Sequence, residues 1–427
     1  MNNKERKSYL SALGAKSSKI FNNKFYFLLL VFSITIQLFR YFDYAIYPNV
    51  LQWNTQELTM SYRYGFIRRG LLGTFTYFLY DCFNIKFIDA VSIVQSLGMI
   101  LFTVSFLLFF RQLLKNEKDT TFRFAALILI SLNVWGFYFN YFGLLDTYII
   151  FFTFLMVYLI VSGKALFLIP VLAGVCLLIH EGYPMMFFGI IMALLLYRFC
   201  YSEDKKERIR YGIIILTTGL VVGSLFIYSY ILHPRIDNPD INGILNTCKD
   251  LLRVDYENEI ETSNIRYIWL DDKIDTSTWH GQTNMWIDGK PTGWFYKLMT
   301  AIFLNALLLS PLFFMTVKFW VKTIKKEPEK LRKILLTLCS LMVFLSFPLI
   351  VIHLDQARWF YADVIFEIVV IGAISILNYN NERKTLSEIT KLTLPRVLLV
   401  MFYYVFYWNT HLFTISSLFD SLTSWIQ

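Results

Sequence analysis

The sequence predicts an all-α, polytopic integral membrane protein. The chain of 427 residues is 56% hydrophobic and 18% aromatic, with 41 phenylalanines and 27 tyrosines, which is too apolar for a soluble domain. Its apolar residues fall into blocks of about 20, the length that an α-helix needs to cross a bilayer. Most of its 40 lysines and arginines lie beside alternate gaps between these blocks, as expected for loops on the cytoplasmic side.

These blocks predict about eleven transmembrane helices. The apolar segment 74–80 is too short to span a bilayer, and we expect it to form a juxtamembrane helix in the first external loop. The block at 165–180 is also short and contains Pro170. The predicted spans cover residues 25–47, 87–110, 122–140, 145–162, 165–180, 183–199, 211–232, 297–321, 334–352, 360–378 and 396–414.

The charge distribution also predicts the orientation and the domain organisation. Residues 1–24 form a polar, basic cytoplasmic tail without a cleavable signal peptide, and residues 415–427 form an external tail. Between them, 25–414 form one transmembrane domain with external loops at 48–86 and 233–296. The second loop is rich in tryptophan and acidic residues, so it is either a cap that stacks on sugar rings or a segment that marks the membrane interface.

Several function classes are disfavoured. A net charge of +9 would suggest nucleic acid in a soluble protein, but here it follows from membrane topology, so we expect no nucleic-acid partner. The five cysteines show no metal-ligand spacing, and the cytoplasmic loops contain no glycine-rich phosphate loop. The sequence therefore predicts no metal, no cofactor and no dependence on a nucleotide.

The stretch 62–73 places three arginines among three glycines, directly before the short helix predicted at 74–80. Positive charge on the external side opposes the usual topology rule, so Arg68 and Arg69 are not explained by membrane anchoring. Such a pair at a helix start could hold a diphosphate through forked hydrogen bonds. Arg63 is a further candidate for binding the same group.

The other polar residues near membrane depth also fall at predicted external helix ends. Asp146 could simply cap the helix that it opens, and Asp355 could pair with Arg358 one turn away. The dipeptide His180-Glu181 stands beside Gly182 and Pro184, which we expect to break the helix and open a polar pocket. The full set is Asp43, Glu57, Arg63, Arg68, Arg69, Asp146, His180, Glu181, Asp355 and Arg358.

Arginines and carboxylates at one external face suit a lipid diphosphate substrate. The arginines would neutralise the leaving diphosphate, and a carboxylate would take the proton from an attacking sugar hydroxyl. The candidate bases are, in order, Glu181, Asp43 and Asp146, with His180 in the same pocket. Displacement in one in-line step would invert the anomeric configuration.

These motifs resemble those of bacterial oligosaccharide repeat-unit polymerases of the Wzy type, within the membrane glycosyltransferases of the C-type fold. The resemblance rests on 65–73 (GFIRRGLLG), Leu145-Asp146, His180-Glu181 and Asp355-x-x-Arg358-Trp359. It implies polymerisation of undecaprenyl-diphosphate-linked repeat units into O-antigen or capsular polysaccharide at the outer face of the bacterial inner membrane. It also implies diphosphate binding by Arg68, Arg69 and Arg358, and it admits a chain-length regulator as a partner.

Two other functions remain open. Asp43, placed ahead of a juxtamembrane helix, is similar to the catalytic carboxylate of C-type transferases that add a single sugar from a polyprenyl-phosphate donor. A transporter of lipid-linked glycan would instead place polar residues near the bilayer midplane and use broken helices. The polar residues singled out above cluster at one face, which favours a transferase.

Overall fold

The structure is a computed structural model, and the residues that it describes are all-α apart from one small hairpin. The hairpin pairs β1 (Trp286–Ile287) with β2 (Lys290–Pro291) in antiparallel register. The structure describes residues 35, 53–66, 69–116, 138, 143–230, 250–251, 286–287, 290–291, 293–347, 356–379 and 381–389. Both predicted tails and nearly all of the predicted 233–296 cap lie outside these residues.

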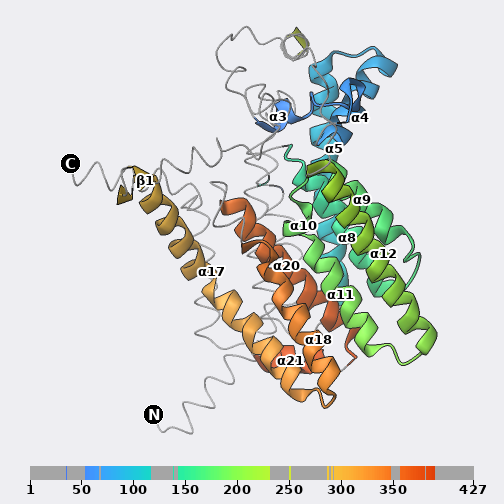
Figure 1. Cartoon of the computed structure of the whole chain (residues 1–427), viewed down its shortest axis with the longest axis vertical. Helices are drawn as coiled ribbons and strands as arrows, with labels where there is room; N and C mark the ends of the chain where they lie inside the picture. Colours follow the sequence, from blue (N-terminus) through green and yellow to red (C-terminus); the bar gives the residue numbers. More distant parts are fainter. Residues whose placement is uncertain are drawn as a thin grey trace.

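Fourteen helical segments are described here (Figure 1). They are α3 (Trp53–Glu57), η1 (Tyr62–Tyr64), α4 (Gly70–Phe83), α5 (Phe87–Asn116), α8 (Asp146–Ser162), α9 (Leu168–Ile179), α10 (Tyr183–Met186), α11 (Phe188–Tyr201), α12 (Lys205–Tyr230), α17 (Gly293–Lys326), α18 (Lys330–Leu341), η3 (Met342–Leu345), α20 (Gln356–Leu377) and α21 (Glu382–Ile389).

Three helices in the described part of the chain are long and apolar enough to cross a membrane. They are the stretches Phe87–Phe109 of α5, Lys205–Ser229 of α12 and Arg358–Leu377 of α20. The apolar blocks therefore correctly predicted an all-α chain with long apolar helices. The predicted spans at 25–47, 122–140 and 396–414 lie almost entirely outside the described residues, so the full number of spans stays a prediction.

The local breaks follow the sequence. The block at 165–180 becomes α9, a helix of 12 residues, and the block at 183–199 becomes the short α10 followed by α11. The block at 334–352 begins as α18 and continues as the 3₁₀ segment η3. The segment predicted as a juxtamembrane helix at 74–80 lies inside α4, a helix of 14 residues.

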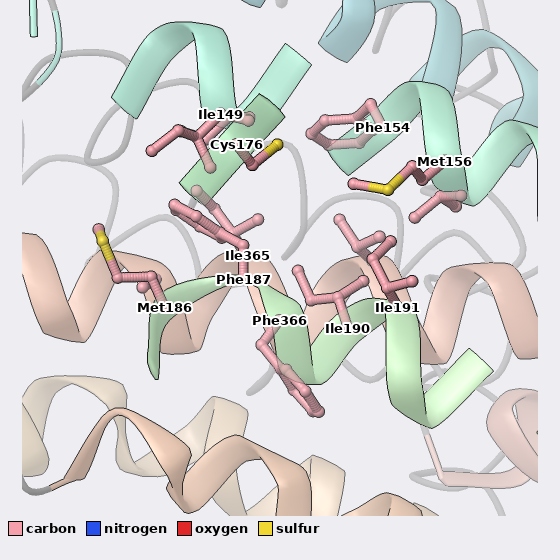
Figure 2. Packing of buried hydrophobic residues seen from close by; sticks show 14 of the residues in the cluster. Ile149, Phe154, Met156, Cys176, Met186, Phe187, Ile190, Ile191, Ile365 and Phe366 are labelled. Atoms are coloured by element: carbon pink, nitrogen blue, oxygen red, sulfur yellow. The ribbon is translucent and has the colours of Figure 1, made fainter. Parts of the chain in front are cut away.

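The core is an apolar cluster in which α8, α9, α11 and α20 meet. Figure 2 shows Ile149 of α8 and Cys176 of α9 near Ile190 of α11 and Phe366 of α20. In the most apolar window of α20, 89% of residues are buried, against 22% in that of α12. Thus α20 is a central helix, whereas α12 exposes apolar side chains such as Leu216 and Leu220 at the periphery.

The helices run between two ends of the molecule, which we name by their elements. The α3–α4 end lies opposite the α18–α21 end in Figure 1. At the α18–α21 end, buried tyrosines of α11 bond to carboxylates from other segments. Tyr197 donates to Glu382 at 2.5 Å, and Tyr201 donates to Glu327 at 2.8 Å. These bonds connect the end of α11 to α21 and to the turn between α17 and α18.

The start of α4 packs against the chain that leads into it. A Cβ atom added at Gly73 would lie 1.6 Å from the carbonyl oxygen of Met60, so only glycine permits this approach. We expect Gly73→Ala to destabilise the protein by at least about 1–3 kcal/mol, because backbone cannot yield as a side chain can. The thermal unfolding midpoint in detergent measures this effect.

Gly219 in α12 provides the matched control, since an added Cβ there meets nothing within 4 Å. Gly219→Ala is expected to leave the midpoint unchanged or to raise it, because alanine suits a helix interior better by about 0.5–1 kcal/mol. Equal midpoints for the two variants would contradict the tight approach of α4 to Met60.

Candidate functional site

A buried cluster of one arginine and two glutamates lies at the α3–α4 end. All three guanidinium nitrogens of Arg69 donate to carboxylates. Nε lies 2.9 and 2.7 Å from the two oxygens of Glu181, Nη2 bonds to the same carboxylate, and Nη1 bonds to Glu57. The side chains of Arg69, Glu57 and Glu181 are only 12%, 3% and 11% exposed. We call these three residues the Arg69 cluster.

Each member of the cluster comes from a different break between helices. Glu57 ends α3, and Arg69 is the N-cap of α4. Glu181 stands between α9 and α10, where His180 takes an extended conformation and Pro184 occupies the first turn of α10. Because proline has no N–H to donate, it starts a helix easily but cannot continue the previous one. The helix break predicted at these residues is confirmed.

The backbone of Arg69 is in the left-handed region, with φ at +62°. This conformation is uncommon for a residue with a side chain, and it persists only where the surroundings stabilise it. Here the preceding turn is held by Thr74, whose hydroxyl accepts from the N–H of Tyr62 at 2.8 Å, and by Ser61, which caps η1. These contacts hold η1 against the start of α4, the helix that Arg69 caps.

The cluster contains one positively charged group and two carboxyl groups. Burial alone would lower the pKa of Arg69, but the carboxylates of Glu181 and Glu57 outweigh that effect and raise it above its usual range. Arg69 is therefore permanently charged. One guanidinium faces two carboxylates, so the three groups together carry a negative charge when both glutamates are ionised. The carboxylate oxygens are hydrogen-bond acceptors, so the cluster suits a hydroxyl-bearing ligand.

His180 adjoins the cluster as a neutral side chain. Its Nδ1 accepts the backbone N–H of Gly182 at 2.8 Å, so Nδ1 holds no proton and the ring proton is on Nε2. The distance of 3.8 Å between Nδ1 and Glu181 is accordingly a contact of the neutral ring with a carboxylate rather than an ion pair. His180 is 3% exposed and helps to hold the turn that presents Glu181.

A second buried ion pair lies at the starts of α8 and α20. Arg358 donates from Nε and Nη2 to both oxygens of Asp146, and the two side chains are 8% and 0% exposed. Capping does not explain Asp146, because the N-cap position of α8 is Leu145 and no side chain caps it. The suggested pairing of Arg358 with Asp355 stays a prediction, because Asp355 lies outside the described residues.

The two groups are joined through α5. Gln95 donates to the hydroxyl of Thr55 at 3.1 Å, two residues before Glu57. On its other side Gln95 packs against Gly143, where an added Cβ would lie 2.4 Å from its side chain. Gly143 precedes Asp146 by one short turn. The Arg69 cluster and the Arg358–Asp146 pair therefore lie on either side of one glutamine.

The remaining predicted site residues are separate from these groups or lie outside the described part. Arg63 pairs with Asp81 at 2.8 Å, but both side chains are more than 40% exposed, at 42% and 47%. Exposed pairs of this kind contribute little. Asp43, Arg68 and Asp355 lie outside the described residues, so their roles stay predictions.

The sequence reasoning missed two groups of residues. Glu57 was noted as polar but given no role, and Gln95 was not considered. Asp363 and Glu367 were also overlooked, although they lie inside the block predicted at 360–378, so the inference that polar residues gather only at one face was wrong. The signal was visible, because an acidic residue inside an apolar span is unusual.

The described part of the chain is therefore an all-α protein with helices long and apolar enough to span a membrane. It carries two buried ion-pair groups at one end. Among the described residues, no three histidines, cysteines or carboxylates are grouped as metal ligands. Compared with known proteins, the chain matches no family model, no curated protein and no solved structure.

Proposed function

We propose that the chain is a membrane glycosyltransferase that polymerises undecaprenyl-diphosphate-linked oligosaccharide repeat units into O-antigen or capsular polysaccharide. The observation that carries the proposal is the Arg69 cluster, in which a helix break holds Glu181 against a permanently charged arginine. Buried carboxylates fixed by an arginine at a helix end suit proton transfer at the membrane surface. The site would lie at the outer face of the bacterial inner membrane.

In this reaction Glu181 accepts the proton of the attacking sugar hydroxyl. The oxygen of that hydroxyl forms a bond to the anomeric carbon of the donor glycan as the bond from that carbon to the diphosphate breaks. Undecaprenyl diphosphate leaves with the electron pair, and the configuration inverts. Arg69 acts as a positioning residue, because all three of its nitrogens are directed at Glu57 and Glu181. Arg68, its neighbour in the chain, is proposed to bind the diphosphate.

Asp146 is a weaker candidate for the base than Glu181. Each of the two carboxylates bonds to an arginine through both oxygens, but the side chain of Asp146 is 0% exposed, whereas that of Glu181 is 11% exposed. A fully buried carboxylate of this kind serves as a structural partner of Arg358. A sugar hydroxyl could reach it only if the ion pair separated. The pair is therefore proposed to position the ends of α8 and α20 beside the site.

The first test is the surface glycan of a deletion strain. Loss of the polymerase is expected to leave glycan with a single repeat unit, seen as collapse of the ladder on a gel. Restoring the wild-type gene should restore the ladder, and restoring the Glu181→Gln variant should not. Normal long chains in the deletion strain would rule out the polymerase.

The second test measures turnover by purified protein on a lipid-linked repeat unit. Glu181→Gln keeps the shape of the side chain but removes the proton acceptor, so we expect the rate to fall by about 10²- to 10⁴-fold. Glu203→Gln, at an exposed position before α12, is the control and should retain wild-type turnover. Wild-type turnover in Glu181→Gln would assign the base to another carboxylate, with Asp43 next.

A single-sugar transferase is the second candidate, and α4 is the observation that favours it. This helix of 14 residues lies within the first predicted external loop, 48–86, where that branch of transferases is expected to have a juxtamembrane helix. The proposed base is then Asp43, and the donor is a polyprenyl-phosphate sugar. In that case the deletion strain keeps its chain length and loses one side-branch sugar, which mass analysis of the released glycan detects.

A further inference from the structure

Two carboxylates are buried in the middle of the central helix, away from the candidate site. Asp363 and Glu367 lie one turn apart on α20, and they are 7% and 2% exposed. Glu367 is nine residues from Arg358 and ten from Leu377, the ends of the apolar stretch that could cross a membrane. At a rise of about 1.5 Å per residue, it stands near the midpoint of that stretch.

The neighbouring helices supply hydroxyl groups to this pair. Ser346, which follows η3, bonds to Asp363, and its Oγ also lies 3.1 Å from the carbonyl oxygen of Val343. From α17, Thr316 lies close enough to Glu367 to interact with its carboxylate. The geometry falls short of a full hydrogen bond, so Oγ1 of Thr316 and Oε2 of Glu367 are both buried without a hydrogen-bond partner among the described residues.

The contacts of Ser346 indicate where a proton is held. A serine hydroxyl has one hydrogen to donate, yet its oxygen faces two acceptors, the Val343 carbonyl and the Asp363 carboxyl. If the serine donates to the carbonyl, the bond to Asp363 needs a proton on the carboxyl group. A protonated Asp363 that donates to Ser346 satisfies all three groups.

No described cation compensates the pair. Three charged groups on the surrounding helices have other partners: Asp146 of α8 pairs with Arg358, Glu382 of α21 accepts from Tyr197 of α11, and Lys326 of α17 donates to Thr385 of α21. Within the described part of the chain, Asp363 and Glu367 form no ion pair. Two uncompensated carboxylates in an apolar core would be costly, so a bound positive charge is required.

We propose that Asp363 and Glu367 form a buried proton-binding site in the middle of the helix bundle. Asp363 holds the proton and donates it to Ser346, and Glu367, one turn away, is the second acceptor, with Thr316 beside it. Loss of the proton would place a charge among α17, η3 and α20, so proton occupancy controls how these three segments pack. The site is independent of the transferase proposed above.

Infrared spectra of the purified full chain test this site directly. A protonated carboxyl group absorbs separately from a carboxylate, and its band shifts in heavy water. We expect such a band at neutral pH in the wild-type protein and its loss in the Asp363→Asn/Glu367→Gln double variant. Asp89→Asn, at an exposed position in the first turn of α5, is the control and should keep the band.

Three results would overturn the proposal: no protonated carboxyl band in the wild-type protein, a band unchanged in the double variant, or a band that appears only when sodium is removed. The third result would mean that the site holds a sodium ion. If the double variant does not elute as a single folded species, Ser346→Ala serves instead. That variant removes only the acceptor of the proposed bond, so the band should persist at a shifted frequency, and an unshifted band contradicts the assignment.

Discussion

Replacing Arg358 with alanine is expected to destabilise the protein by about 3–5 kcal/mol, the cost of leaving one member of a buried ion pair without its partner. Asp146, whose side chain is 0% exposed, would then hold an uncompensated charge at the start of α8. The free energy of unfolding, measured by titration with a denaturing detergent, reports this loss. Asp146→Ala should have an effect of similar size.

The double variant Asp146→Leu/Arg358→Met separates the pair from the rest of the fold. Removing both charges together leaves apolar groups in apolar surroundings, so we expect it to recover most of the stability lost by either single change. Additive losses would show that the two side chains do not act on each other. Arg63→Ala is the surface control, because its pair with Asp81 is exposed and contributes about 1 kcal/mol or less.

Replacing Arg69 has the second large expected effect, because this residue acts on both stability and proposed activity. Arg69→Ala removes the guanidinium to which the buried Glu57 and Glu181 both bond, which we expect to cost about 3–5 kcal/mol. In the transferase assay, a displaced Glu181 should lower turnover by about 100-fold or more, since a shift of about 1 Å in a reacting group has that consequence.

Arg69→Lys distinguishes the charge from the geometry. Lysine keeps the positive charge but cannot present a planar fork to two carboxylates. We expect it to recover part of the unfolding free energy while turnover stays low. Full recovery of both quantities would mean that Arg69 acts only as a charge, and wild-type turnover in Arg69→Ala would remove the cluster from the proposed mechanism.

The helices were largely predictable, because each depends on residues close together in the sequence. The apolar runs that became α5, α8 and α20 need only length and composition to identify them, and Gly182 with Pro184 marks the break before α11. The short helix after the arginine stretch was predicted for the same reason. Its boundaries, from Gly70 to Phe83, extend a few residues beyond the apolar segment because its first turn packs against Met60.

The partners within the site were not predictable from such local patterns. Arg69 meets Glu181 across 112 residues, and Arg358 meets Asp146 across 212 residues, so no spacing in the chain signals either bond. Their charge and their position on the predicted external side indicated that these residues lie at one end of the molecule. The structure adds which carboxylate faces which arginine: Arg69 bonds to Glu57 and Glu181, and its binding of a diphosphate stays a prediction.

Gln95 contacts the segments that carry both ion-pair groups, so it offers a physical route by which one group could affect the other. Its amide donates to Thr55, two residues before Glu57. Its side chain packs against Gly143, three residues before Asp146. A ligand that displaced Glu57 from Arg69 could therefore also shift Gln95, whose side chain contacts Gly143 just before α8. Linkage is reciprocal, so if a ligand of the Arg69 cluster shifts the Arg358–Asp146 bond, a change in that bond alters the affinity of the cluster for the ligand by the same factor.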